Sequence, residues 1–556
     1  DDWQLSSQLS VIGGVRVEWL SGDAPDANPA FFDRYGFTNS IGFGKIDPVV
    51  LPRLGFTYDL YNDGFFSNTQ VKGGIGRFTG GDPAVYFSNA FSNNGFAVGF
   101  GQTGVANCVP EGTQADVVTG GTFTGIPSCV VANAAAQSAG GRADTQSTSP
   151  DFKQPTVWRA NFGFSTDFGV GNGFLSDWNL TADFIYSRFD NPVDFVDLSQ
   201  VPDTRRPGGA FTVDGRPIYR AIDPSIAGCT ATLLNQGGRP PVYTNVNPVC
   251  FNTGRDDEIQ LVNGESFESK IASVILSKQI GSGVFTGERG NILFNFGYAY
   301  TDAENNRYSN SSTATSSFDV VAAADRQLVT PARSEFSSKH NITAAVNFRE
   351  QFFGDYDTSF GLIFIARSGR PYSIVFDNGP SSVLNDSASG DFNSLLYVPT
   401  GINDPNLAPT SNAGAVAALD EYISNTPCLN DFRGQTVERN SCENSWFYDL
   451  DLRFSQDIPG PASAFGLRND RLKLFVDVDN FLNLIDSDAN VLKTYGYTEA
   501  VVRADIDAQG RYVYTNFTVP LDRNKETAVP TRGPPFPFGA DRAPWNTPRR
   551  TVVSLP

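Results

Sequence analysis

The sequence predicts an all-β fold, namely a transmembrane antiparallel β-barrel with long extracellular loops. Two observations support this prediction. Apolar and polar residues alternate in segments of about nine to eleven residues or slightly more, the length that a tilted membrane-spanning strand needs. The connections between these segments are short and long in turn, as in barrels that have short turns at one end and long loops at the other.

The composition narrows the class of protein further. Of the 556 residues, 18% are charged, whereas roughly 25% is usual in soluble domains. No uninterrupted apolar run reaches about 18 residues, so no transmembrane helix is predicted. The 60 acidic residues outnumber the 41 basic ones, which are scattered, and this disfavours a nucleic-acid surface. A single His, His340, excludes most zinc sites.

The clearest alternation lies in segment 291–302. Its even positions are apolar or aromatic from Ile292 to Tyr300, whereas Asn291 and Asn295 stand at odd positions. Because successive strand side chains point to opposite faces, this segment has one apolar and one polar face. The same reasoning predicts twelve strands in all: 8–19, 53–60, 69–79, 157–168, 178–187, 267–279, 291–302, 339–349, 358–370, 445–455, 471–479 and 550–555.

The charged and amide side chains of these strands share the polar face. An Arg or Lys on the lipid face near the membrane midplane costs about 2–4 kcal/mol. We therefore expect the following residues to face a lumen: Arg159, Asp183, Asn295, Asp449, Asp451, Arg453, Lys473, Asp477 and Asp479. Charges of both signs suggest either a polar passage or a polar plug packed inside, and the sequence leaves both open.

The connections alternate in length without a skip. The predicted outer loops are 20–50, 80–154, 190–266, 303–336, 378–443 and 486–546. The short turns are 61–67, 169–176, 280–290, 351–357 and 458–470. Since backbone groups in hydrocarbon cannot bond to water, the sheet must close on itself or belong to a larger barrel.

A soluble β-sandwich is the alternative, because alternation also arises when one sheet face packs on a core. The regular alternation of short and long connections argues against a soluble sandwich. So do aromatic residues near the segment ends, where interfacial girdles would lie. These residues are Trp158, Trp178, Trp446, Tyr186, Tyr298 and Tyr300.

Several stretches resemble the barrel half of Oar-like TonB-dependent outer-membrane receptors, in the right order over nearly the whole chain. The early ones are DWQLSSQLSVIGGVRVEWL (2–20), LPRLGFTYDL (51–60) and VKGGIGRFTGGDPAVYFSNAFSNNG (71–95). The later ones are VWRANFGFS (157–165), SGRPYS (368–373), LLYVP (395–399), FRGQTVERNS (432–441) and FVDVDNFLNLI (475–485).

The resemblance implies a 22-stranded barrel, an N-terminal plug domain in its lumen and a coupling box that contacts TonB. This sequence supplies about twelve strands and none of the plug. Residues 1–556 are therefore expected to be the C-terminal part of the barrel region. The sequence departs from the family at its end, TVVSLP, where an aromatic residue usually closes the last strand.

The resemblance also implies a function, which is capture of a ligand by the extracellular loops and its energy-coupled passage through a plugged lumen. The implied location is the outer membrane of a Gram-negative bacterium. Expected partners are outer-membrane lipid and lipopolysaccharide, the plug domain and TonB, but no nucleic acid. Two alternatives remain: a structural or adhesive barrel that presents its loops to surface or periplasmic proteins, and a passive 12-stranded channel. No enzyme is expected, because no nucleophile and base can be assembled.

The six Cys lie in pairs, each within one predicted outer loop. Six Cys permit 15 connectivities, and near-neighbour pairing is the simplest: Cys108 with Cys129, Cys229 with Cys250, and Cys428 with Cys442. Closing each loop would stabilise it by about 3 kcal/mol in the chain-entropy model. Metal ligation, the alternative, needs shorter spacings or His partners.

Other candidate sites are weaker. His340 is expected at the rim of the apolar face, and the Gly-rich stretch at 71–81 lacks the spacing of a phosphate-binding loop. Acidic stretches in the loops could bind Ca²⁺ or could be solvated charge; they are Asp256, Asp257 and Glu258, and Asp486 and Asp488. No other cofactor is expected, and the carboxylate pairs on the polar face are interpreted as pore polarity.

Overall fold

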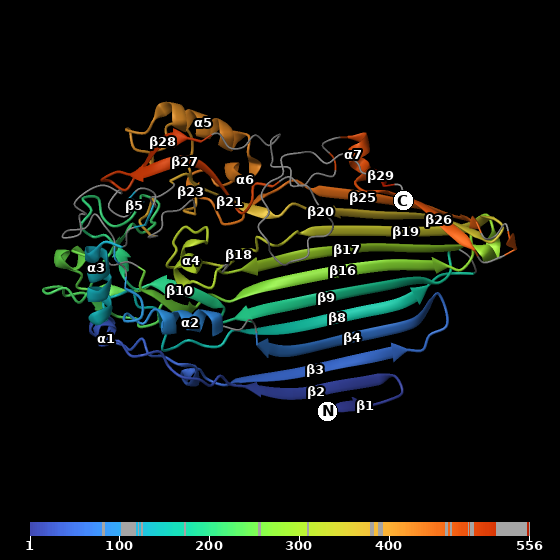
Figure 1. The fold of residues 1–556 in the computed structure, drawn as a ribbon, viewed down its shortest axis with the longest axis horizontal. Helices are drawn as coiled ribbons and strands as arrows, with labels where there is room; N and C mark the ends of the chain where they lie inside the picture. Colours follow the sequence, from blue (N-terminus) through green and yellow to red (C-terminus); the bar gives the residue numbers. More distant parts are fainter. Residues whose placement is uncertain are drawn as a thin grey trace.

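The structure is a computed structural model that describes most of the chain. The described residues are 1–79, 84–99, 101, 118–119, 122–123, 126–171, 174–253, 257–307, 311–378, 383–386, 393–461, 465–466, 470–486, 489, 494–518 and 553–554. Its largest element is a 14-stranded antiparallel sheet, here called the main sheet, in which strands adjacent in the sheet follow one another along the chain (Figure 1).

The main sheet runs in chain order from one edge to the other. Its strands are β1 (Asp2–Gln4), β2 (Leu9–Glu18), β3 (Val49–Leu60), β4 (Phe66–Thr79), β8 (Thr156–Phe168), β9 (Trp178–Asp190), β16 (Phe267–Ile280), β17 (Asn291–Asn305), β19 (His340–Phe353), β20 (Tyr356–Arg367), β25 (Phe447–Pro459), β26 (Arg471–Val478) and β29 (Val553–Ser554), with β18 (Ala332–Arg333) paired to β17.

The prediction of an antiparallel sheet is confirmed, and each of the twelve predicted strands has its counterpart in order. Two details were wrong, and one prediction is tested only in part. β1 was not predicted. Of the strand expected at 550–555, Val553–Ser554 are present as β29, and its other residues lie outside the described residues. The strand expected at 358–370 ends at Arg367, because the chain leaves the main sheet at Ser368 and enters another sheet at Pro371.

The long connections all leave the same end of the main sheet. In Figure 1 most of their helices and short strands gather at the left, which we call the loop end, and the short turns lie at the right, the turn end; α7 (Phe481–Ile485) is drawn to the right of the centre, above β25. This arrangement follows from the antiparallel pairing, which reverses the chain at each strand. In the turn between β19 and β20, Gly354 has a φ of 66°, a conformation that glycine adopts readily.

The long connections are folded, which their description as loops did not predict. We call their described residues the loop assembly. Its helices are α1 (Pro29–Tyr35), α2 (Ala84–Ser92), α3 (Ser128–Ala139), α4 (Ala314–Asp319), α5 (Ala413–Ser424), α6 (Pro427–Asn430) and α7 (Phe481–Ile485). No helix among the described residues is long and apolar enough to cross a membrane.

Short strands from different connections pair within the loop assembly. They are β5 (Val118–Thr119), β6 (Thr122–Phe123), β7 (Ser147–Thr148), β10 (Val193–Asp197), β11 (Gln200–Pro202), β12 (Tyr219–Ala221), β13 (Thr232–Leu233), β14 (Tyr243–Thr244), β15 (Ile259–Asn263), β21 (Pro371–Phe376), β22 (Tyr397–Val398), β23 (Gln435–Thr436), β24 (Cys442–Glu443), β27 (Thr498–Ile506) and β28 (Tyr512–Phe517). β21 pairs with β27 in parallel, which joins two connections that are far apart in sequence.

The buried apolar residues concentrate in the loop assembly. One core contains Tyr372, Leu419 and Tyr512, and a second contains Phe87, Phe195 and Phe318. In the middle of the main sheet, by contrast, large apolar side chains are exposed: Val15 by 70%, Leu54 by 55% and Phe296 by 37%. The molecule therefore has a conventional hydrophobic core at the loop end and an uncovered sheet elsewhere.

The register between β16 and β17 can be tested by crosslinking. Ser277 and Asn295 are direct partners, and the Cβ atoms of such partners lie about 4.5–5.5 Å apart. We expect the variant Ser277→Cys/Asn295→Cys to crosslink under mild oxidation, measured by the mass of the joined peptides. Ser277→Cys/Gly297→Cys is the control, because it is two residues out of register. Crosslinking of the control alone would contradict the register.

Candidate functional site

The register places eight of the nine predicted lumen-facing residues on one face of the main sheet. Asn295 is joined through consecutive partners to Asp451 on one side and to Ser277 and Asn179 on the other, and Asp183 faces the same side as Asn179 by alternation along β9. Arg159, Asp449, Arg453, Lys473 and Asp477 follow by the same alternation. Asp479 lies just beyond the end of β26. We call this surface the polar face; whether it lines a lumen remains a proposal.

Ion pairs cross between strands on the polar face. Lys72 Nζ lies 3.7 Å from Asp183 Oδ1, although these residues are on β4 and β9 with β8 between them. Gly163 stands between them in the register. A Cβ at this glycine would lie 2.5 Å from Lys72 Cε and 2.6 Å from Asp183 Oδ1. The absence of a side chain at Gly163 therefore lets the ion pair form.

A second group of ion pairs lies on the last long strands. Arg453 Nε is 3.5 Å from Asp477 Oδ1, and Lys473 Nζ is 3.7 Å from Asp457 Oδ1. Asp451 accepts a hydrogen bond of 2.8 Å from the backbone N–H of Asn480. Because these charged groups are paired or hydrogen-bonded, we interpret them as a polar surface and not as acid–base residues.

Two hollows are bordered by polar-face side chains. One, of about 630 Å³, is bordered by Arg53, Phe78, Arg159 and Asn161 and is floored by glycines of β2, β3 and β4. The other, of about 540 Å³, is bordered by Gln279, Asn291, Asn347, Arg349, Arg453 and Lys473. The lining of the first hollow is mainly apolar, whereas the second offers charged and amide groups that suit polar ligand groups.

The opposite face of the main sheet is apolar. The residues at even positions of β17 face the same side as Val274, Phe360 and Leu474. Of the predicted girdle residues, Trp158, Trp178 and Trp446 lie at or beside the ends of β8, β9 and β25, whereas Tyr186 and Tyr298 lie nearer the middle of β9 and β17. At the loop end, the ring of His340 stacks on that of Trp446 with centroids 5.9 Å apart. The hydroxyl of Tyr298 lies 2.9 Å from His340 Nδ1. His340 thus lies at the rim of the apolar face, within an aromatic group.

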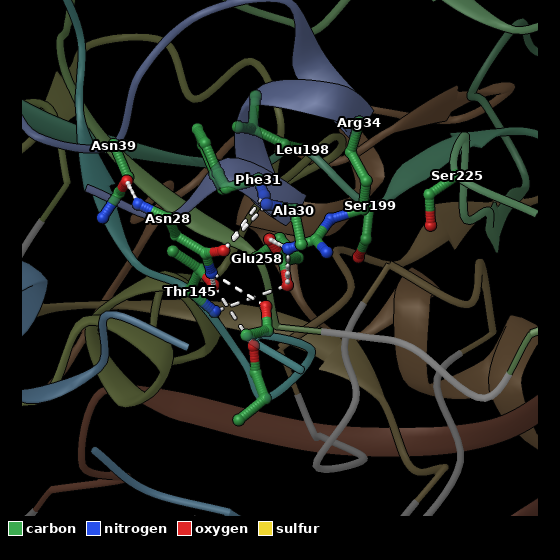
Figure 2. Close-up of polar contacts among 12 residues, drawn as sticks. Asn28, Ala30, Phe31, Arg34, Asn39, Thr145, Leu198, Ser199, Ser225 and Glu258 are labelled. Atoms are coloured by element: carbon green, nitrogen blue, oxygen red, sulfur yellow. Dashed lines mark hydrogen bonds and ion pairs between the residues drawn. The ribbon is translucent and has the colours of Figure 1, made fainter. Parts of the chain in front are cut away.

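Asn28 joins three segments of the loop assembly (Figure 2). Its side-chain oxygen accepts from the N–H groups of Ala30 and Phe31 and so caps α1, while its amide donates to Gly141 O at 2.8 Å and to Thr145 Oγ1 at 3.1 Å. Its own N–H donates to Asn39 Oδ1 at 2.7 Å. One buried amide thereby fixes the first two long connections to each other.

A buried ion pair attaches α1 to the third connection (Figure 2). Arg34 Nη2 lies 3.3 Å from Glu258 Oε2, and both side chains are at most 1% exposed. The guanidinium also lies over the rings of Phe31 and Tyr35. Glu258 accepts in addition from the N–H of Thr145. Sequence reasoning had assigned Glu258 to a possible Ca²⁺ site, whereas here its carboxylate pairs with an arginine.

Asp194 is the centre of a second buried network. Its carboxylate lies 2.5 Å from Arg307 Nε and 2.6 Å from Arg239 Nη1. Burial lowers the pKa of Arg307, and Asp194 opposes that shift by favouring the charged form. Arg307 also donates to the carbonyls of Phe318 and Arg326. These contacts join the third and fourth connections, and no spacing in the sequence indicated them.

Tyrosines join the remaining connections. Tyr397 and Tyr512 stack with ring centroids 4.9 Å apart, and the Tyr512 hydroxyl donates to Asp214 Oδ1 at 2.9 Å. Burial raises the pKa of Tyr512 to about 12, so its hydroxyl keeps its proton. Tyr514 donates to the carbonyl of Tyr397. Residues from three different connections thus share one packed, hydrogen-bonded core.

Two of the three predicted disulfides are present, Cys229–Cys250 and Cys428–Cys442. Cys108 lies outside the described residues, so its pairing with Cys129 stays a prediction. The described residues contain no group of three or more His, Cys, Asp or Glu side chains that could hold a metal. Asp256 and Asp488 lie outside them, and the Ca²⁺ prediction is not tested there.

Comparisons with known proteins bear on the fold. No family model and no curated protein matches the sequence. Among solved structures, the chain is similar to the outer membrane transporter YddB from Escherichia coli, with 11% identity, a TM-score of 0.36 and coverage of 91% of this chain. The RagAB peptide transporter gives 10% identity, a TM-score of 0.34 and coverage of 92%.

The chain spans only part of these two structures, 41% of the YddB chain and 44% of the RagAB chain. The RagAB peptide importer in its "open-open" state gives 10% identity, a TM-score of 0.34 and coverage of 86% of this chain and 42% of that chain. The Oar-like resemblance is not tested by these matches and stays a prediction.

Removal of the Arg34 guanidinium should destabilise the loop assembly. Arg34→Leu would leave the Glu258 carboxylate buried without its cation, and breaking such a pair costs about 3–5 kcal/mol. The double variant Arg34→Leu/Glu258→Leu should lose less. The measurement is the urea midpoint of the loop assembly, followed by limited proteolysis.

The control is Arg205→Leu, which removes a partly exposed pair with Asp203. Such pairs contribute about 0–1 kcal/mol, so the midpoint should hardly move. A loss in the double variant as large as in Arg34→Leu would contradict the importance of the unpaired charge.

Proposed function

We propose that this chain is the C-terminal part of the barrel of a TonB-dependent receptor or transporter in the bacterial outer membrane. The observation that carries the proposal is the two-faced main sheet. From β2 to β26 one face is apolar and exposed at mid-strand, and the other bears charged and amide groups. Such a sheet suits a boundary between lipid and an aqueous lumen.

The exposure of the apolar face is costly in water. Burying a large apolar side chain is worth about 1.5–3 kcal/mol, and this face leaves Phe162, Phe184, Phe296 and Phe454 between 37% and 52% exposed. A folded chain whose core lies only in the loop assembly would gain by covering this face. Lipid is the covering that also accounts for aromatic residues at both ends of the strands.

Closure of the barrel requires further strands. Among the described residues, β1 and β29 are the ends of the main sheet and do not pair with each other. An open sheet edge in hydrocarbon leaves backbone groups unsatisfied. We infer that strands beyond those that the structure describes complete the barrel, in keeping with the 22 strands that the Oar-like resemblance implies.

In this proposal the loop assembly lies outside the cell and captures the ligand, the polar face lines the lumen, and a plug from outside this chain gates passage when TonB acts on it. The hollow of about 540 Å³ on the polar face, which is bordered by Arg349, Arg453 and Lys473, supports a lumen that holds polar groups. The chemical nature of the cargo follows from neither the sequence nor the structure.

A structural or adhesive barrel is the second candidate. The observation that favours it is the packed core of the loop assembly, which presents a fixed surface joined by buried pairs such as Arg34–Glu258. A partner protein could bind this surface without any passage through the barrel. A passive channel is the third candidate and differs in needing no energy input.

Cysteine reactivity in the full-length protein on intact cells separates these candidates. Asn295→Cys on the polar face should react with a small, charged, water-soluble thiol reagent, and the reaction should slow when the proton-motive force is dissipated. Phe296→Cys, the neighbouring residue on the apolar face, is the matched control and should not react. The measurement is the labelled fraction by mass spectrometry.

The outcomes differ for each candidate. Reaction at Asn295→Cys whose rate does not change when the proton-motive force is dissipated would favour a passive channel. Failure of both variants to react would favour a filled barrel that serves as an anchor. Reaction at Phe296→Cys alone would reverse the assignment of the two faces and overturn the proposal.

A further inference from the structure

Every short turn of the main sheet exposes a large apolar side chain. Leu5, Phe65, Phe174, Phe285, Phe353 and Phe465 belong to the six successive turns or to the strand residue beside them, and they are 52% to 88% exposed. We call these six residues the turn collar. Turns in water favour Gly, Asn, Asp, Pro and Ser instead, so an apolar residue at each turn needs a physical reason.

Hydrogen bonds hold parts of the collar in place. Glu350 at the end of β19 accepts from the N–H groups of Phe285 and Thr286, at 3.1 and 3.0 Å. Trp178 Nε1 donates to Phe174 O at 2.8 Å. Gly169 N–H donates to Phe65 O at 3.0 Å. Hydrogen bonds therefore fix the backbone of these three turns, and their Phe side chains remain exposed.

At the turns of Phe65 and Phe174 the collar is continuous with the apolar face of the main sheet. The Phe65 ring lies 5.9 Å from that of Phe168, and the Phe174 ring lies 5.4 Å from that of Trp178. Trp178 in turn contacts Phe294 at 5.6 Å. Phe168 and Trp178 are direct partners in the register. The turns thus extend the apolar face past the ends of the strands.

This continuity points to one occupant. Whatever covers the apolar face of the strands also reaches the turns, and a lipid leaflet is continuous around a barrel, whereas a protein partner covers a limited patch. We propose that the turn collar is buried in the boundary between headgroups and acyl chains of the leaflet at the turn end. This inference rests on the proposed membrane-spanning function and adds that the turns themselves bind the lipid surface.

The collar would set how deeply the barrel is seated. Apolar residues at such a boundary are buried by about 5–10 Å, and the Phe and Leu side chains of the collar would contribute apolar area there. The short turns would then lie against the membrane instead of projecting from it. The loop assembly at the other end would remain in water.

Depth-dependent quenching tests this proposal. Single cysteines are introduced into the full-length protein at Phe65, Phe285 and Phe465, and each is labelled with an environment-sensitive fluorophore under non-reducing conditions, with the unsubstituted protein as the labelling blank. The protein is reconstituted into phospholipid vesicles that contain spin-labelled lipids with the quencher near the headgroup or deep in the acyl chains. Asp63→Cys, in the same turn as Phe65 and exposed, is the matched control.

The expected result is stronger quenching by the shallow lipid than by the deep one at the three collar positions, and quenching at Asp63→Cys that is weaker than at Phe65→Cys. Phe296→Cys reports on the membrane-spanning function itself and should be quenched most by the deep lipid. Quenching at Phe296→Cys without quenching at the collar would overturn the collar proposal alone and would leave the turns for a protein partner or for water. Loss of quenching at every position would refute the membrane-spanning function and the collar together.

Discussion

The main sheet depends on one constraint, which is that backbone N–H and C=O groups must be paired wherever water is absent. From β2 to β26 each strand pairs with its neighbours, with register shifts between β4 and β8 and between β19 and β20. In the proposed membrane setting, such pairing is the condition under which the apolar face can meet lipid. Because successive side chains of a strand point to opposite faces, the charged side chains of Asp183, Arg453 and Lys473 lie on the face opposite the apolar one.

The loop assembly obeys a different constraint, that of a protein folded in water. Its long connections bury apolar side chains and also charges, and the buried charges are paired across connections. Arg34–Glu258 and Asp194–Arg307 each join segments more than 100 residues apart in sequence. Because an unpaired buried charge is costly, these pairs fix which connections lie together. The result is a structured surface in place of flexible loops.

The sequence predicted the main sheet well because its signal is local. The two-residue alternation is visible within a single strand such as 291–302. The alternation of short and long connections predicted the topology. The loop assembly could not be predicted in this way. The partners of Arg34, Asp194 and Tyr512 lie in other connections, and nothing in the spacing of these residues identifies them. β1 was missed because three residues, Asp2–Gln4, are too few for a periodic signal.

The candidate site shows the same division. The members of the polar face could be predicted from the alternation of side chains. The ion pair of Lys72 with Asp183 could not be predicted, because it depends on the strand order and on Gly163 between the two residues. Two disulfides were correctly predicted from proximity in sequence. Glu258 was assigned to a possible ion site because its neighbours in sequence are acidic, although its partner in space is basic.

The central claim is that the even positions of β17 face lipid and the odd positions do not. The most direct measurement compares Phe296→Arg with Asn295→Arg, two adjacent positions that receive the same charge, by the yield of folded protein in the outer membrane. A lipid-facing Arg near the midplane costs about 2–4 kcal/mol. The account predicts that Phe296→Arg largely blocks assembly while Asn295→Arg is tolerated. Equal yields, or a greater loss at Asn295→Arg, would contradict it.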